Sequence, residues 1–284
     1  MSSARPAEVP AGPPRRSLSR GEDARRRFLR SAVGAGALVS LATLGYLPVA
    51  RRGEGRLRPP GALEEKDFLA SCIKCGQCVQ VCPVQAIELA DIGDGFGIGA
   101  PYIEARAQAC DFSCDAGQCI LACPTGALTY DKPPHLAVRA GMPFKTPPVL
   151  LAKEKDPEPT INVKERMGLA RVARPEICLA RQGKGFKGAA RGESFAGLLR
   201  FVERDRWRPI LLREHPYDVA VCDLCVQTCP IKGALSLEPL SGATGAMTPV
   251  VHEPCLGCGT CEMVCPTEPA AIVVEVRKGW GAGG

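Results

Sequence analysis

The segment CLGCGTCEMVCP at residues 255–266 repeats the cysteine spacing of an earlier segment, CIKCGQCVQVCP, at residues 72–83. Both follow the pattern C-x2-C-x2-C-x3-C-P, and a short apolar step, Ala86-Ile87 or Ala271-Ile272, comes soon after each. A unit that recurs along one chain is an internal repeat, and such a repeat governs the architecture of the chain that contains it. We therefore take this unit as the starting point.

Two further cysteine groups have looser spacing but the same ending. Each closes with Cys-Pro and is followed by a similar apolar step. The four groups in chain order, called here the first to the fourth group, are Cys72, Cys75, Cys78 and Cys82; Cys110, Cys114, Cys119 and Cys123; Cys222, Cys225 and Cys229; and Cys255, Cys258, Cys261 and Cys265.

The spacing suits iron–sulfur clusters of the [4Fe–4S] type. Three thiolates on a short curled loop reach three irons of one cubane, and the fourth cysteine of such a run ligates the other cluster of a pair. Gly76, Gly257 and Gly259 allow the loop to turn tightly around the sulfurs. We also expect the fourth cysteine to begin a short helix, because the proline after it lacks an N–H and presets φ for a helix start.

The third group lacks one cysteine, and Cys178 is left over among the sixteen in the chain. It follows an apolar stretch at residues 167–172, much as Cys255 follows residues 248–251. We therefore expect Cys178 to be the first ligand of the third group, with Cys222 displaced by an insertion. The alternative is a buried free cysteine. With Cys178 included, the sixteen cysteines suffice for four [4Fe–4S] clusters.

Disulfides and zinc are the competing explanations for so many cysteines. Cysteines two or three residues apart are poorly placed to pair across a fold, even in an exported protein. Zinc prefers two separated C-x2-C knuckles for each ion. The histidines His135, His215 and His252 form no motif, and the chain has neither a C-x3-C-x2-C motif nor a G-x-G-x-x-G motif. The sequence therefore predicts an electron carrier and no catalytic residues.

The formal net charge of +6 is concentrated near the N-terminus. Residues 1–52 hold ten Arg and three acidic residues, a net of +7, whereas the rest of the chain has a net of −1. This distribution argues against nucleic-acid binding. The stretch Arg25-Arg26-Arg27-Phe28-Leu29 before the uncharged residues 31–50 is typical of a twin-arginine export signal. The alternative is a membrane anchor, which the apolar stretch is just long enough to form.

We expect an α+β fold of two pseudo-symmetric, bacterial-ferredoxin-like dicluster modules, at residues 53–130 and 161–284. Residues 131–160 contain seven prolines and should form an extended linker. An insertion at residues 181–217 carries Phe195, Leu198, Leu199 and Val202 at helical spacing, which predicts an amphipathic helix. Its basic character fits either a solvated face or a docking surface for an acidic partner.

The chain resembles the ferredoxin-type NapG/MauM family over residues 25–130 and 161–275. Family members are similar in placing a lone cysteine before the third group, which supports Cys178 as a ligand. This sequence departs from the family in the proline-rich linker and in the long insertion. The resemblance rests on the export signal and on residues 56–62, 75–80, 101–102, 123–128, 167–170, 222–225 and 258–259.

The resemblance implies a place on the periplasmic face of the cytoplasmic membrane. Electrons would arrive from quinol through a membrane-bound iron–sulfur quinol dehydrogenase subunit. They would leave to a periplasmic reductase of the nitrate reductase type or to a c-type cytochrome. An iron–sulfur subunit of a molybdenum oxidoreductase, methylamine-utilisation electron transfer and an iron–sulfur scaffold without electron flow are the alternatives.

The pairing of the groups has two possible arrangements. Consecutive groups could exchange their fourth cysteines, or the inner groups could pair while the outer groups close around them. The second group, with Asp111, Cys114 and Gln118-Cys119, resembles the second run of reductase electron-transfer subunits, in which the nested arrangement holds. We therefore predict that Cys82 joins the fourth group, that Cys265 joins the first, and that the inner groups exchange Cys123 and Cys229.

Overall fold

The computed structural model describes residues 20–51, 55–91, 97–114, 117–129, 137–138, 161–162, 167–201, 204, 208–242 and 244–276. The chain divides into two units, Met1–Ala50 and Arg51–Gly284. Apart from residues 137–138, the proline-rich stretch at 131–160 lies outside the described residues, so the extended linker stays a prediction.

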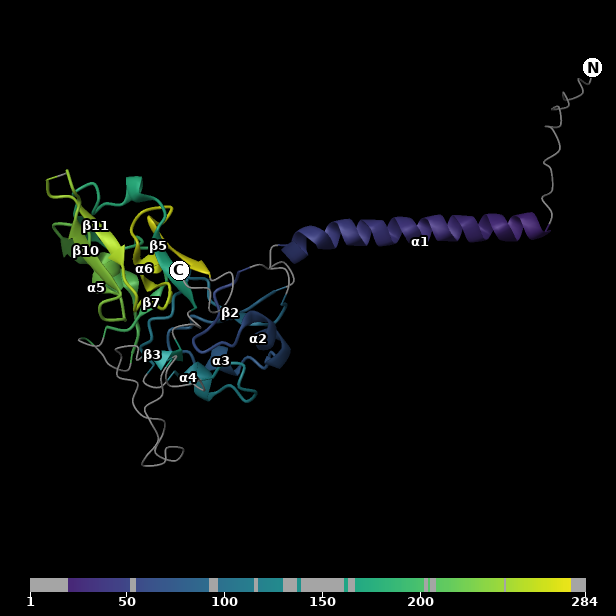
Figure 1. Cartoon of the computed structure of the whole chain (residues 1–284), viewed down its shortest axis with the longest axis horizontal. Helices are drawn as coiled ribbons and strands as arrows, with labels where there is room; N and C mark the ends of the chain where they lie inside the picture. The colour runs from purple at the N-terminus through teal and green to yellow at the C-terminus, as the bar shows by residue number, and fades with distance from the viewer. Residues whose placement is uncertain are drawn as a thin grey trace, which may run out of the picture. The chain divides into compact units, whose positions relative to one another are not determined.

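The N-terminal part of the chain forms one long helix, α1 (Arg20–Arg51), which Figure 1 shows as a continuous coil. Its 32 residues extend for about 48 Å, more than the roughly 30 Å of a bilayer's hydrocarbon core. Within the described part of the chain, its segment Ala24–Gly45 is the one helix long and apolar enough to cross a membrane, with a mean hydropathy of 1.4. Its large apolar side chains, from Phe28 to Leu44, are exposed. The helix therefore suits a signal sequence or an anchor.

Four short helices in the second unit each carry the third cysteine of a group. They are α3 (Gln77–Gln80), α4 (Gln118–Leu121), α5 (Leu224–Gln227) and α6 (Thr260–Val264). A glycine in the left-handed region, such as Gly76 at φ 74° or Gly259 at φ 92°, precedes three of them and reverses the chain into the helix.

The expected helix after the fourth cysteine is wrong. Helix α3 has ended before Cys82, and Cys265 is itself the residue that ends α6. The backbone N–H of Ala86 donates instead to the sulfur of Cys82, at 3.3 Å. A helix beginning at Cys82 would use that N–H for its own ladder, so the chain makes a turn there.

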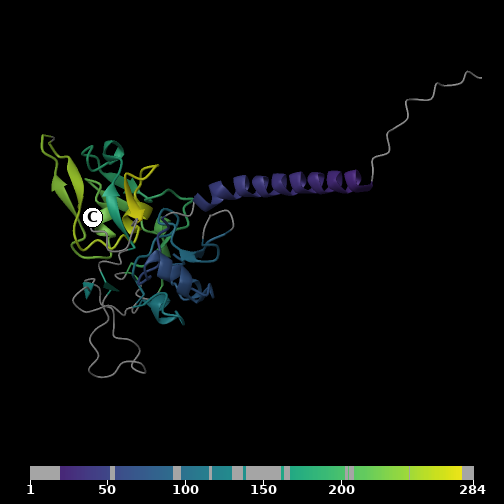
Figure 2. The same ribbon diagram turned by 45° about the vertical axis from the view of Figure 1, so that its right-hand side comes forward.

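The two halves of the second unit repeat one plan of antiparallel strands. In the first module, residues 55–129, β1 (Glu88–Leu89) pairs with β2 (Pro101–Tyr102), and Ala62 forms an isolated bridge with Leu128. In the second module, residues 167–276, β10 (Leu235–Pro239) pairs with β11 (Met247–Val251), and β5 (Gly168–Val172) pairs with β12 (Ile272–Val276). Figures 1 and 2 both show β5 beside the yellow C-terminal strand β12.

The remaining elements are short. They are α2 (Glu65–Ser71), β3 (Ala137–Val138) paired with β4 (Ile161–Asn162), the 3-10 turns at Pro175–Ile177 and Leu212–Glu214, β6 (Phe186–Gly188) paired with β9 (Tyr217–Val219), and β7 (Leu198–Leu199) paired with β8 (Ile210–Leu211).

The predicted helix in the insertion is wrong: Leu198 and Leu199 form a strand, and Val202 lies outside the described residues. The side-chain amide of Gln108 both accepts from the N–H of Leu198 and donates to its carbonyl, at 2.8 Å each. A carboxylate oxygen of Asp111 accepts from the N–H of Arg200 at 3.0 Å. These first-module side chains satisfy an extended backbone, and this tertiary contact outweighs the local helical spacing.

One core of small residues runs through both modules. Alanines and ten of the sixteen cysteines dominate it, and Phe68 is a rare fully buried aromatic side chain. Few large apolar side chains therefore fill the interior of the two modules.

Candidate metal centres

The sixteen cysteines all lie within the described residues and all are free thiols, so none of them forms a disulfide. In the described part of the chain, no three His, Cys, Asp or Glu side chains are close enough to hold a single metal ion. A zinc ion would need four ligands within about 2.3 Å of one centre, so this spacing disfavours zinc.

Burial raises the pKa of most of these thiols. The pKa rises to about 11 for Cys78 and for Cys222, and to about 12 for Cys258. Such thiols keep their protons at neutral pH unless a metal replaces them, so loading these sites releases protons.

Site 1 contains the first three cysteines of the first group and the last cysteine of the second. Cys72, Cys75, Cys78 and Cys123 line one cavity together with apolar residues such as Phe68. Cys75 is exposed, whereas Cys78 is buried. Site 1 is thus open to solvent on one side.

Site 2 contains the first three cysteines of the second group and the last cysteine of the first. Burial, and then the neighbouring thiolates of Cys114 and Cys82, raise the pKa of Cys119. Burial, and then Cys114 and Cys119, raise the pKa of Cys110. The side chains of these four cysteines therefore lie near one another.

Sites 3 and 4 are built in the same way in the second module. Each of them is a small cavity lined by four cysteines and by apolar side chains. Their cysteines are Cys178, Cys222, Cys225 and Cys265 at site 3, and Cys229, Cys255, Cys258 and Cys261 at site 4. Cys178 thus lies in the position of a first ligand, although more than forty residues separate it from Cys222.

The nested pairing predicted from the second group is wrong. Cys82 lies beside Cys114 and Cys119, not beside the fourth group, and Cys265 lies at site 3, not at site 1. The hairpin of β1 and β2 leads from the first group directly to the second, and that of β10 and β11 leads from the third to the fourth. Short hairpins bring consecutive groups together, so consecutive groups exchange their last cysteines.

The last cysteines of three groups accept hydrogen bonds from backbone N–H groups. Ala86 donates to Cys82 at 3.3 Å, Leu128 to Cys123 at 3.4 Å and Ala271 to Cys265 at 3.3 Å. Burial works to raise the pKa of Cys123, but the hydrogen bonds from Leu128 and Thr125 outweigh it and lower that pKa. Donors aimed at sulfur stabilise the thiolate form, which is the form that ligates iron, so these residues fit an iron–sulfur cluster.

A 4Fe-4S dicluster domain model matches residues 71–127 and 220–268, one match for each module. Among curated proteins, the chain is 31% identical to the methylamine utilization ferredoxin-type protein MauM of Methylorubrum extorquens, over 92% of each chain. It is 33% identical to the ferredoxin-type protein NapG of Escherichia coli, over 89% of this chain and 86% of that one. The chain belongs to the NapG/MauM family of ferredoxin-type proteins. It is an iron–sulfur electron-transfer protein.

The similarity extends to further family members. The MauM protein of Paracoccus denitrificans is 33% identical over 89% of this chain and 86% of its own length. No solved structure matches the chain. For this NapG/MauM-family protein, the arrangement of the cysteines therefore comes from its own structure.

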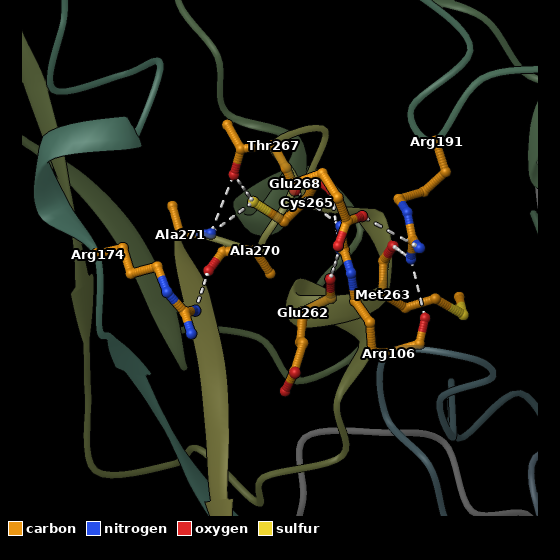
Figure 3. A network of polar contacts seen from close by, with 10 residues as sticks. All are labelled: Arg106, Arg174, Arg191, Glu262, Met263, Cys265, Thr267, Glu268, Ala270 and Ala271. Atoms are coloured by element: carbon orange, nitrogen blue, oxygen red, sulfur yellow. Dashed lines mark hydrogen bonds and ion pairs between the residues drawn. The ribbon is translucent and has the colours of Figure 1, made fainter.

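An arginine network holds the loop that carries Cys265, as Figure 3 shows. The guanidinium of Arg106, in the first module, donates to the carbonyls of Glu262 at 2.5 Å, Cys265 at 2.9 Å and Thr267 at 2.8 Å. It also pairs with the carboxylate of Glu268 at 2.8 Å. The first module thus positions Cys265, which lines site 3 in the second module.

Two further arginines support the same loop (Figure 3). Arg191, in the insertion, donates to the carbonyls of Arg106 at 2.9 Å and Met263 at 3.3 Å. Arg174 approaches from the opposite side and donates to the carbonyl of Ala270 at 2.8 Å. The described part of the insertion therefore braces the contact between the modules.

Arg58 has a comparable role beside site 1. Its side chain is 2% exposed, pairs with Glu65 at 2.6 Å and donates to the carbonyl of Pro101 at 2.8 Å. Its guanidinium also stacks over Phe68 at 5.0 Å, and both Phe68 and Pro101 line site 1. A charge this deeply buried needs such partners.

The cysteine motifs alone do not reveal these supporting residues. Arg58, Arg106, Arg174 and Arg191 all lie outside the cysteine groups. A basic residue in an otherwise acidic or apolar stretch, such as residues 101–111, is the weak signal that could have pointed to Arg106.

Proposed function

We propose that this protein is an exported carrier that holds four [4Fe–4S] clusters. The observation that supports it is the grouping of all sixteen cysteines into four sets of four. Each cluster would supply one-electron exchange between its oxidised and reduced states. The protein would act as a carrier and not as an enzyme.

The residues of the chain would hold and tune these clusters. The ligands would be Cys72, Cys75, Cys78 and Cys123 at site 1; Cys82, Cys110, Cys114 and Cys119 at site 2; and the cysteines named above at sites 3 and 4. Backbone N–H groups such as that of Ala271 would stabilise the thiolates. The apolar walls of the sites would exclude water. Burial of the clusters and the hydrogen bonds to their sulfurs would then set the reduction potentials.

We propose that the paired arginines, Arg25 and Arg26, direct export by the twin-arginine route to the periplasm. They lie on α1 just before its apolar stretch. Residues 1–52 would be the signal, which would either be removed or remain as an anchor on the outer face of the cytoplasmic membrane. Modules at 53–130 and 161–284, joined by a linker at 131–160, would follow it.

The partners follow from the family. Electrons would come from a membrane-bound iron–sulfur quinol dehydrogenase subunit and would leave to a periplasmic reductase of the nitrate reductase type or to a c-type cytochrome. The similarity to a methylamine utilization protein supports electron transfer in that process as the second candidate.

The test is the metal content of the anaerobically purified protein. We expect about sixteen irons and sixteen acid-labile sulfides for each chain, from four cubanes. Cys178→Ser should lose site 3 and leave about twelve irons, whereas Ser241→Ala, an exposed control, should keep about sixteen. A wild-type content near twelve, with no change in Cys178→Ser, would contradict the role of Cys178 and the count of four.

A further inference from the structure

The two modules meet where a ligand of site 2 touches a ligand of site 4. The backbone N–H of Cys110 donates to the carbonyl of Cys258 at 3.2 Å. Cys110 also forms a parallel β-bridge with Gly259, the next residue. One direct hydrogen bond therefore connects a proposed ligand in the first module to one in the second.

The side chain of Thr260 strengthens this contact. It is fully buried, and its hydroxyl donates to the carbonyl of Cys110 at 3.1 Å. The same oxygen lies 3.6 Å from the sulfur of Cys258, within hydrogen-bonding range of it. A hydroxyl in an apolar core is costly unless it is hydrogen-bonded, so Thr260 is held between these two cysteines.

The other three groups do not place a hydroxyl at this position. The residue before the third cysteine is Gln77 in the first group, Gln118 in the second and Leu224 in the third. Gln77 is exposed, and Leu224 is buried without a polar side chain. Thr260 therefore has a role specific to the contact between modules.

The exchange of last cysteines fixes the neighbours within each module. Helix α3 and the turn after it place Cys78 at site 1 and Cys82 at site 2, so these sites are adjacent. Helix α6 and its end place Cys261 at site 4 and Cys265 at site 3, so these sites are also adjacent. With the contact of Cys110 and Cys258, the order becomes site 1, site 2, site 4, site 3.

We propose that electrons cross between the modules at the Cys110–Cys258 contact, and that Thr260 is the positioning residue of this crossing. The proposal rests on the proposed function, because it requires clusters at sites 2 and 4. In each transfer, one electron would leave one of these two clusters and enter the other. The charge of the first cluster would rise by one, and the charge of the second would fall by one. No bond is made or broken, and Thr260 keeps its proton.

A series of this kind has two ends, site 1 and site 3. Site 1 is the more open of the two, because Cys75 is exposed while all four cysteines of site 3 are buried. In this order, an electron that enters at site 1 reaches site 3 through the crossing.

The test compares Thr260→Val, which keeps the shape and removes the hydroxyl, with Thr260→Ser, which keeps the hydroxyl. Gln77→Val, at the same motif position in the first group, is the matched control. Each full-length holoprotein is analysed for iron and sulfide, and then by a redox titration followed by electron paramagnetic resonance. The titration reports the potential of each cluster and the magnetic coupling between reduced neighbours.

We expect all three variants to keep the wild-type iron content. Thr260→Val leaves the carbonyl of Cys110 without the hydroxyl that donates to it. Loss of one hydrogen bond changes an equilibrium by about tenfold, so the sharing of an electron between sites 2 and 4 should shift by about that factor, or about 59 mV for one electron. The coupling between modules should weaken in Thr260→Val, while Thr260→Ser and Gln77→Val should match the wild type.

Two outcomes would overturn the proposal. One is a Thr260→Val protein with full iron content whose potentials and coupling equal those of Gln77→Val. The other is a Cys261→Ser variant, without a cluster at site 4, in which sites 2 and 3 still exchange electrons rapidly. If instead the wild type itself lacks four clusters, the proposed function fails, and the iron analysis reports that separately.

Discussion

The first and fourth cysteine groups have the same spacing but lie in opposite surroundings. Cys75, the second cysteine of the first group, is exposed, whereas its counterpart Cys258 is 7% exposed. The residue that follows two positions later is the exposed Gln77 in one case and the fully buried Thr260 in the other. Identical spacing therefore builds similar ligand loops, and the fold decides which loop faces solvent and which connects the modules.

The glycine after the second cysteine shows the same contrast. Gly76 and Gly259 both have a positive φ, 74° and 92°. A Cβ on Gly76 would meet only the end of the Leu89 side chain, at 3.8 Å. A Cβ on Gly259 would lie 2.6 Å from the Cβ of Ala105, in the first module. The backbone reason for glycine is shared, but the packing reason exists only in the fourth group.

Gly259→Ala should give the largest difference between the two groups. The left-handed backbone costs about 1–2 kcal/mol for any residue with a Cβ, so this is the whole expected cost of Gly76→Ala. Gly259→Ala adds about 1–3 kcal/mol of overpacking, because Ala105 has no flexible side chain that could move aside. The measurement is the thermal loss of cluster absorbance in the two purified variants.

Equal stability of Gly76→Ala and Gly259→Ala would contradict this prediction. If both variants lose their clusters at the same temperature, the modules do not pack as closely at Gly259 as the structure shows. Iron analysis before heating separates a loading defect from a loss of stability.

Arg106→Met should give the next largest effect. The change removes the hydrogen-bond donor of the carbonyls of Glu262, Cys265 and Thr267. Because water can replace part of these hydrogen bonds, the free energy of unfolding should fall by about 2 kcal/mol. The matched control is Arg171→Met, which removes an ion pair between side chains that are 60% and 54% exposed and should cost less than about 1 kcal/mol. Denaturant unfolding followed by cluster absorbance measures both.

Site 3 should be affected before site 1 in Arg106→Met, because the lost hydrogen bonds all reach the loop around Cys265. Equal costs in Arg106→Met and Arg171→Met would show that the loop needs no support from the first module.

The smallest effect concerns the pH dependence of the same network. The hydrogen bond from Arg106 and its positive charge lower the pKa of Glu268 below its ordinary value of 4.5. The folded pKa is therefore below the unfolded one, so this stabilisation is complete above about pH 4.5 and declines as the pH falls through the folded pKa. Because Glu268 is solvent-exposed, the decline should be slight.

Glu268→Gln isolates this contribution. The variant should be slightly less stable than the wild type at pH 7, and the two stabilities should converge as the pH falls below 4.5. A constant difference across pH 3–7 would mean that the carboxylate of Glu268 does not pair with Arg106.

Much of the chemistry is present in the sequence because ligand spacing is a local property. The four groups, their Cys-Pro endings and the apolar steps after them are each contained in a few residues. The apolar stretch before Cys178, which is like the one before Cys255, is enough to predict that Cys178 belongs to the third group. In the structure Cys178 lines the same cavity as Cys222. The apolar stretch of α1 is equally local, since length and composition define it.

Two predictions from the sequence are wrong because contacts between distant residues override the local pattern. The spacing of Leu198 and Leu199 predicts a helix, but hydrogen bonds with Gln108, ninety positions earlier, hold Leu198 in an extended strand. The cysteine pattern does not fix the partner of Cys82, because all four groups end in Cys-Pro and so give no sign of which group each last cysteine joins.

The cysteine spacing alone is enough to predict the candidate sulfur ligands, because a cluster-binding loop needs only neighbouring residues to form. The tertiary structure alone decided that consecutive groups exchange their last cysteines, that Arg106 supports Cys265, and that Cys110 meets Cys258. These contacts join residues about 26 to 159 positions apart. Their formation depends on how hairpins and loops pack around one small core, and no local pattern encodes that packing.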